Sequence, residues 1–150
     1  MFRLSLLIGL LVPCLLGCNN NPRTYPVTGK VVYPDGSHPE FGDIEFFNAE
    51  AKLNARGRIQ KDGTFELGTF DLADGAVEGT HKVIILQRTR NHLTAQLEGE
   101  IAHDHGDLMD PKYYDYRTSK LTAKVEPIDQ NQIEIQVRKM KKKKQEKADH

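Results

Sequence analysis

Cysteine is almost absent from this chain of 150 residues, and both cysteines, Cys14 and Cys18, lie close to its start. The sequence after Cys18 therefore contains no thiol that could form a disulfide, act as a nucleophile or bind a metal. Serine is nearly as scarce: only Ser37 and Ser119 follow Cys18, and neither lies in the Gly-x-Ser-x-Gly motif of a hydrolase. A glycine-rich phosphate-binding loop is also missing. These absences remove thiol, serine-hydrolase and nucleotide-phosphate chemistry from consideration.

The first 17 residues are predicted to be a signal peptide. Arg3 precedes an apolar run from Leu4 to Gly17, which is shorter than the ~20 apolar residues of a membrane-spanning helix. The stretch LLGC then resembles the lipobox of bacterial lipoproteins, although Leu16 stands where a smaller residue is commoner. An ordinary signal peptide without lipidation is the alternative.

The lipobox resemblance implies cleavage after Gly17 and lipid attachment to Cys18. More than one acyl chain would then anchor the protein stably, since a single chain binds only marginally. Residues 18–24 would form a short polar tether. We therefore expect an exported protein that is held by lipid at the periplasmic face of the inner or outer membrane.

Charge is unevenly distributed along a chain whose formal net charge is zero. Residues 18–137 contain 13 basic and 19 acidic side chains, whereas residues 138–150 contain seven basic and two acidic ones. We place a basic tail at residues 139–150, and such charge runs are usually solvated and disordered. Contact with anionic lipid headgroups or wall polymers is the functional alternative. We expect no nucleic-acid partner, because exported proteins seldom meet nucleic acid and no aromatic residue interleaves the lysines.

Residues 25–138 are predicted to form one all-β domain. Short segments of alternating apolar residues are separated by Gly and Pro, and Asp62-Gly63 is a favoured hairpin turn. Their spacing favours a seven-stranded β-sandwich, with strands at 27–33, 41–47, 54–60, 64–70, 80–87, 120–126 and 131–138. The stretch HKVIILQ is apolar on both faces and is expected to be a central strand. Residues 88–119 form a long insertion, in which Leu93, Leu97 and Ile101 allow about two helical turns.

A resemblance covers nearly all of this domain. The stretches YPVTGKVVYPDG, GDIEFF, ARGRIQKDGTFELGTF, DGAVEGTHKVIIL, DPKYYDYRTSKLTAKV and NQIEIQV follow one another in order. This ordered set resembles the carboxypeptidase regulatory-like, transthyretin-like domain of small lipoproteins from planctomycete bacteria. His81 departs from the pattern, because a tyrosine is common at its position. The resemblance implies a prealbumin-like, Ig-like β-sandwich and no catalytic residues.

Two groups of side chains are candidate sites. In the stretch HDHGDLMD, His103, His105, Asp107 and Asp110 offer the imidazole and carboxylate ligands that divalent metal ions prefer. A solvated acidic loop is the alternative for that stretch. Three neighbouring tyrosines could form a ligand-stacking patch or belong partly to the core, and these are Tyr113, Tyr114 and Tyr116.

Taken together, the sequence predicts a non-catalytic, membrane-anchored envelope lipoprotein. Its β-sandwich would bind or scaffold a protein or polysaccharide partner, without a cofactor. The alternative is a metal-binding protein or metal-dependent enzyme that uses the 103–110 loop. The sequence gives no indication of the oligomeric state.

Overall fold

The computed structural model describes residues 21–87 and 108–140. The predicted signal peptide, the lipidation site Cys18, most of the insertion and most of the basic tail lie outside the described residues. Within them the chain forms nine strands and two short helices. In chain order these are β1 (Thr24–Tyr25), β2 (Val27–Val32), β3 (Gly42–Asn48), β4 (Leu53–Ile59), β5 (Thr64–Glu66), β6 (Ala76–Val77), β7 (Gly79–Gln87), the 3-10 helix η1 (Pro111–Tyr114), α2 (Tyr116–Ser119), β8 (Leu121–Val125) and β9 (Asn131–Gln136).

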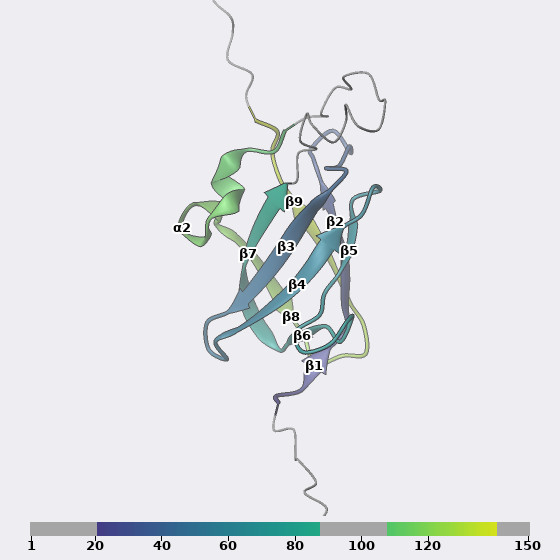
Figure 1. The fold of residues 1–150 in the computed structure, drawn as a ribbon, viewed down its shortest axis with the longest axis vertical. Helices are drawn as coiled ribbons and strands as arrows, with labels where there is room; N and C mark the ends of the chain where they lie inside the picture. The colour runs from purple at the N-terminus through teal and green to yellow at the C-terminus, as the bar shows by residue number, and fades with distance from the viewer. Residues whose placement is uncertain (1–20, 88–107, 141–150) are drawn as a thin grey trace, which may run out of the picture.

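Two sheets pack against each other in a sandwich-like arrangement (Figure 1). One sheet has three strands in the order β5-β2-β9, and the other has four in the order β4-β3-β7-β8. The two-residue strands β1 and β6 pair with each other at one end. The predicted all-β class is therefore confirmed, although the described chain has nine strands where seven were predicted. The two additional strands are β1 and β6.

Strand pairing follows the turns that the sequence specifies. At the hairpin between β4 and β5, Gly63 has a φ of +81° and its N–H donates to the carbonyl of Gln60. The Asp62 side chain accepts hydrogen bonds from the Thr64 N–H at 3.0 Å and the Thr64 hydroxyl at 2.6 Å. As predicted, β7 is an interior strand, since it pairs with both β3 and β8.

The core lies between the two sheets and consists of the inward-facing residues of alternating strands. In β2, Val27 and Val31 are fully buried, and in β3 the same holds for Ile44 and Phe46. This is the alternation that the sequence predicts for half-buried strands. The same pattern buries further residues of the predicted strands, namely Tyr33, Ile59, Phe65, Leu67, Ala123, Val125, Ile135 and Val137.

The two short helices lie beside β7 of the four-stranded sheet (Figure 1). They occupy residues 111–119, the last part of the predicted insertion. Neither helix was predicted at this place. In the described part of the chain, no helix has the length and apolar character needed to span a membrane.

Candidate binding surface

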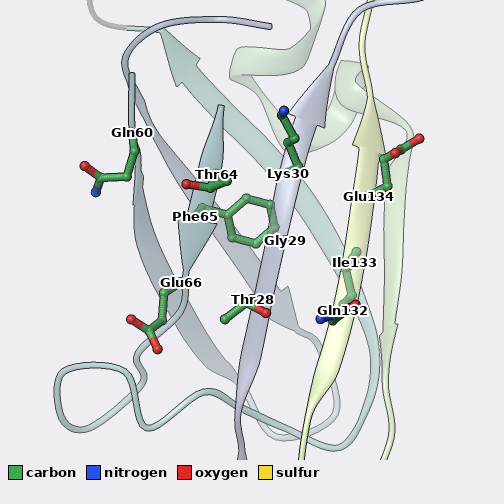
Figure 2. Close-up of a pocket in the computed structure, with 10 residues that line it drawn as sticks. All are labelled: Thr28, Gly29, Lys30, Gln60, Thr64, Phe65, Glu66, Gln132, Ile133 and Glu134. Atoms are coloured by element: carbon green, nitrogen blue, oxygen red, sulfur yellow. The ribbon is translucent and has the colours of Figure 1, made fainter. Parts of the chain in front are cut away.

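The three-stranded sheet presents an outer face that we call the polar face. Six side chains that are exposed or half-exposed define it: Thr28, Lys30, Thr64, Glu66, Gln132 and Glu134. They line a shallow depression of about 680 Å³, shown in Figure 2. Strand alternation explains their placement, because the intervening residues of β2, β5 and β9 face the core.

The register of the sheet arranges the polar face in two rows. Thr28 lies between Glu66 on β5 and Gln132 on β9. Two residues further along β2, Lys30 lies between Thr64 and Glu134. Because neighbouring strands are ~4.8 Å apart, each row is about 10 Å wide. The face can therefore contact an extended ligand along several residues of β2.

Gly29 allows the three strands of the polar face to pack closely. A Cβ atom at this position would lie 2.1 Å from the carbonyl oxygen of Ile133 and 2.4 Å from Cζ of Phe65. The Phe65 ring occupies the inner side of the sheet, where Gly29 has no side chain (Figure 2). The ring also packs against Phe46, with ring centroids 6.0 Å apart. Because Gly29 has no side chain, the Phe65 ring can pack directly beneath the polar face.

Most polar groups of the polar face keep their hydrogen-bonding capacity. Thr28 accepts a hydrogen bond from the Gln130 side chain at 2.9 Å. In residues 21–87 and 108–140, no hydrogen bond or ion pair engages the side chains of Lys30, Glu66, Gln132 or Glu134. One ammonium group, one amide and two carboxylates can therefore bind a hydroxyl-rich ligand directly.

A second depression, of about 1040 Å³, lies over the outer face of β3 and β4 and the loop that follows β5. Two of its charged groups already have partners. Arg56 Nε donates to Glu45 Oε2 at 2.9 Å, and the Tyr116 hydroxyl donates to Glu45 Oε1 at 2.8 Å. Leu72, which is 98% exposed, lies on its rim. We regard this depression as the weaker candidate, because Glu45 and Arg56 would have to exchange existing contacts for a ligand.

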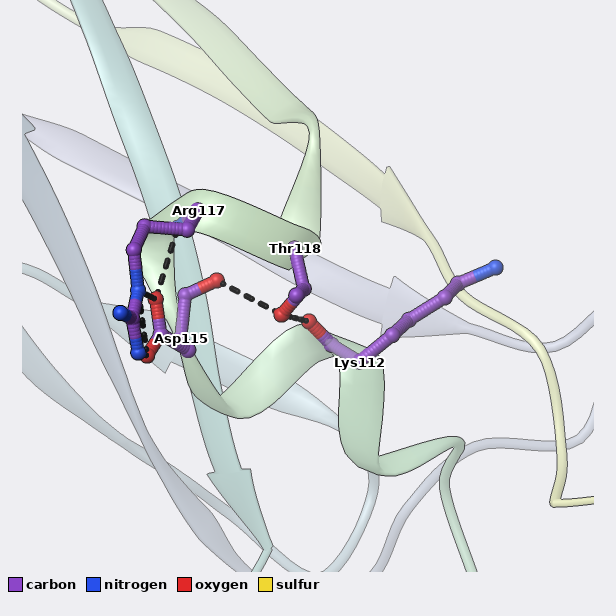
Figure 3. A network of polar contacts seen from close by, with 4 residues as sticks. All are labelled: Lys112, Asp115, Arg117 and Thr118. Atoms are coloured by element: carbon purple, nitrogen blue, oxygen red, sulfur yellow. Dashed lines mark hydrogen bonds and ion pairs between the residues drawn. The ribbon is translucent and has the colours of Figure 1, made fainter.

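The helices η1 and α2 are held together by a polar network (Figure 3). Asp115 caps α2 by accepting a hydrogen bond from the Arg117 N–H at 2.8 Å, and it also pairs with the Arg117 guanidinium at 2.7 Å. These contacts lower the pKa of Asp115 to about 2. The Thr118 hydroxyl donates to the carbonyl of Lys112 at 2.6 Å. All of these contacts are local, so the network explains the shape of this segment.

The three tyrosines that were predicted as a ligand patch have different environments. Tyr113 is buried, and its hydroxyl accepts a hydrogen bond from the N–H of Arg138. Tyr114 is 36% exposed, and partial burial together with the charge of Asp110 raises its pKa. Tyr116 packs on Phe47 with ring centroids 5.7 Å apart. Burial and its hydrogen bond to Glu45 raise the pKa of Tyr116. Tyr113 thus belongs to the core and Tyr116 fastens α2 to the sheet.

The predicted metal ligands are described only in part. His103, His105 and Asp107 lie outside the described residues. Asp110 is described, and its side chain caps η1 by accepting a hydrogen bond from the Lys112 N–H at 3.0 Å. Its second carboxylate oxygen lies 3.7 Å from the Lys112 ammonium group. The described parts of the chain contain no group of three or more His, Cys, Asp or Glu residues placed to hold a metal ion.

Comparison with known proteins gives no relative for this chain: no family model, curated protein or solved structure matches it. The candidate role of the polar face is therefore argued from its geometry alone.

The sequence analysis did not single out the residues of the polar face. Alternation alone places Thr28, Lys30, Gln132 and Glu134 on the outer side of their strands. What the sequence does not show is that β9 lies beside β2, in parallel, with Val27 opposite Asn131. That long-range pairing brings the outward-facing residues of distant segments together.

Proposed function

We propose that this chain is a membrane-anchored envelope lipoprotein whose β-sandwich is a non-catalytic binding module. The polar face is the binding surface, and its partner is a polysaccharide or a protein of the envelope. A hydroxyl-rich polysaccharide suits the surface best, because one ammonium group, one amide and two carboxylates stand in two rows without internal partners.

One observation supports this proposal above the others. On the outer face of the four-stranded sheet, Glu45 is already engaged by Arg56 and by Tyr116 of α2. On the three-stranded sheet, by contrast, Lys30, Glu66 and Glu134 remain available beside a depression of about 680 Å³. Polar side chains without internal hydrogen-bond partners in a concave surface are typical of ligand sites.

The lipid anchor and the family are further parts of the proposal. The LLGC stretch supports lipidation of Cys18 and export. The sandwich-like packing of the two sheets is compatible with the prealbumin-like domain that the ordered sequence stretches resemble. We propose membership of that class on the sequence resemblance.

Binding of envelope material by the mature chain tests the polar face. The mature chain, immobilised, is incubated with solubilised envelope and with envelope polysaccharide, and the bound material is quantified. We expect Gln132→Ala combined with Glu134→Ala to lower binding at least about tenfold, which corresponds to about 1.4 kcal/mol. The matched control is Gln136→Ala combined with Glu40→Ala, since both control residues are exposed and lie outside the depression.

Equal binding by both double variants and the parent chain would rule out the polar face as the surface. Metal analysis of the same purified protein tests the alternative function, a metal-binding protein or metal-dependent enzyme. Stoichiometric metal that disappears when His103 and His105 are changed to Ala would favour a metal protein.

A further inference from the structure

Strand β9 lies at one edge of the three-stranded sheet, and one side of its backbone is open. The N–H of Asn131 donates to the Pro26 carbonyl and that of Val137 to the Val32 carbonyl, each at 2.9 Å. Because backbone groups alternate between the two sides of a strand, the odd-numbered residues of β9 face β2. In the described part of the chain no strand pairs with the other side. That side carries the N–H and carbonyl groups of Gln132, Glu134 and Gln136.

The open edge ends where η1 and its capping residue cover it. Arg138 is the next even-numbered residue after Gln136. Its N–H donates to the Tyr113 hydroxyl at 3.2 Å, and its carbonyl accepts a hydrogen bond from the Asp110 N–H at 3.0 Å. These contacts lie on the side of the chain that faces away from β2, as the alternation requires. The open edge therefore spans residues 132–136.

The usual protections of an edge strand are missing from β9. Natural edges are protected by lysine, proline, bulges or a very short strand. At the other edge of the same sheet, β5 has only three residues, and in the second sheet the edge strand β8 carries Lys124. In contrast, β9 has six residues in unbroken register with β2 and contains neither lysine nor proline. The half-buried side chain of Ile133 adds apolar surface on the side that faces the core.

We propose that this edge pairs with the same edge of a second copy of the chain. The two β9 strands run antiparallel about a two-fold axis, with Ile133 opposite the partner's Ile133. Gln132 then lies opposite the partner's Glu134, and the two residues exchange both of their backbone hydrogen bonds. Their side chains meet on the outer side of the sheet, where the amide donates to the carboxylate. The half-buried Ile133 side chains meet on the inner side.

Other registers of the two strands conflict with the structure. An axis at Glu134 would place this carboxylate opposite its own copy, and like charges directly opposite each other are destabilising. An axis at Ile135 would set Gln132 against the partner's Arg138, whose edge groups are already occupied. An axis at Gln132 would leave Gln136 opposite the turn that precedes β9. The proposed register uses the whole open edge and avoids these conflicts.

This pairing would join the two three-stranded sheets into one sheet of six strands. Because neighbouring strands are ~4.8 Å apart, the joined sheet is about 24 Å wide. The two-fold axis is perpendicular to the sheet, so the polar faces of both copies lie on the same side. The pairing itself needs no ligand, and the proposal is therefore independent of the proposed function.

Cysteine cross-linking tests the register. The mature chain with Cys18→Ser contains no cysteine, so Ile133→Cys introduces a single thiol. Opposite residues of a non-hydrogen-bonded antiparallel pair have Cα atoms about 4.5 Å apart, within the range of a disulfide. We expect oxidation to link Ile133→Cys into a covalent dimer. The control is Gln132→Cys, whose Cα atom lies about 9 Å from its own copy and which should stay unlinked.

Sedimentation equilibrium measures the association without a cross-link, at concentrations up to about 0.2 mM. We expect the mature chain with Cys18→Ser to form a dimer. Glu134→Pro removes an N–H that faces away from β2, so the fold should persist by circular dichroism. The dimer should weaken at least about tenfold, because the interface loses this hydrogen bond in both copies. Glu134→Gln keeps the N–H and, as the control, should retain the dimer.

Three results would overturn the proposal: a chain that stays monomeric, equal cross-linking of Ile133→Cys and Gln132→Cys, or a dimer that Glu134→Pro leaves unchanged. If Glu134→Pro fails to fold, the two cysteine variants decide. Failure of this proposal is distinguishable from failure of the proposed function. A monomer that still binds the envelope fraction would refute the pairing alone, whereas a dimer that binds none of it would refute the binding surface alone.

Discussion

At Gly29, the addition of a single Cβ atom would disturb the packing of the three-stranded sheet. A Cβ atom there would lie 2.1 Å from the Ile133 carbonyl oxygen, which belongs to the backbone and cannot rotate away. We expect Gly29→Ala to lower the free energy of unfolding by at least about 3 kcal/mol, at the upper end of overpacking costs. Urea unfolding followed by circular dichroism measures the change.

Gly36→Ala is the control for this substitution. Gly36 has a φ of +81°, but no heavy atom lies within 4 Å of the position that a Cβ atom would occupy there. Its replacement should cost only the ~1–2 kcal/mol of a left-handed alanine. A smaller loss for Gly29→Ala than for Gly36→Ala would contradict the packing described around Phe65.

Asn131 connects three segments through one buried side chain. Its Oδ1 accepts a hydrogen bond from the Glu126 N–H at 2.9 Å, and its Nδ2 lies 3.1 Å from the Glu126 carbonyl and 3.3 Å from that of Pro26. Asn131→Ala leaves the Glu126 N–H without this partner, so we expect a loss of about 1–3 kcal/mol in the free energy of unfolding. The exposed neighbour Gln130 is the control, and Gln130→Ala should change stability by less than about 0.5 kcal/mol. Similar changes in the free energy of unfolding for the two substitutions would show that the buried hydrogen bonds of Asn131 do not stabilise the fold.

Among the elements, α2 is attached to the four-stranded sheet in part by Tyr116. The hydroxyl donates to Glu45 and the ring packs on Phe47. Tyr116→Phe keeps the ring and removes the hydrogen bond, so we expect a loss of about 0.5–1.5 kcal/mol at neutral pH.

The pH dependence of this effect follows from the direction of the pKa shift. Burial and the Glu45 hydrogen bond raise the pKa of Tyr116 above its ordinary value of 10.0. The stability that Tyr116 contributes is therefore complete below pH 10 and is lost as the pH rises above it. Tyrosine ionisation is followed by absorbance in the folded protein. The ionisation step at the highest pH in the parent protein should be absent from Tyr116→Phe. An unchanged titration curve would contradict the hydrogen bond.

The elements that the sequence predicts correctly are those with local signals. Alternation in VTGKVV and DIEFF and the Asp62-Gly63 turn each specify a strand or hairpin within about ten residues. The strands β1 and β6 were missed, because two-residue strands contain no alternation. The helices η1 and α2 were also missed, since their polar network is formed by capping contacts of Asp110 and Asp115 and has no apolar period.

For the whole molecule, the sequence predicts the class of fold but not the surface that the fold assembles. The polar face requires β9 to pair with β2 across more than 100 residues of chain, and no local pattern encodes that neighbour. The same parallel pairing brings the two ends of the described chain to opposite ends of the sandwich (Figure 1). Both features therefore come from the structure.

The proposed anchor is tested on the whole chain in bacterial cells. We expect labelled fatty acid to enter the parent protein, and Cys18→Ala to yield unprocessed or soluble protein without label. Because Cys14 lies within the predicted signal peptide, Cys14→Ala is the control and should be labelled normally. Equal labelling of Cys18→Ala and the parent chain would contradict lipidation at Cys18.

The central claim is that the polar face is the binding surface, and an amide NMR titration tests it most directly. Isotope-labelled chain 19–150 is titrated with the envelope polysaccharide fraction that it retains. The account predicts that the largest chemical-shift changes fall at residues 28–30, 64–66 and 132–134, on three strands that meet only in the folded sheet. Shift changes confined to other surfaces, such as residues 43–45 and 56–58 on the opposite sheet, would contradict it.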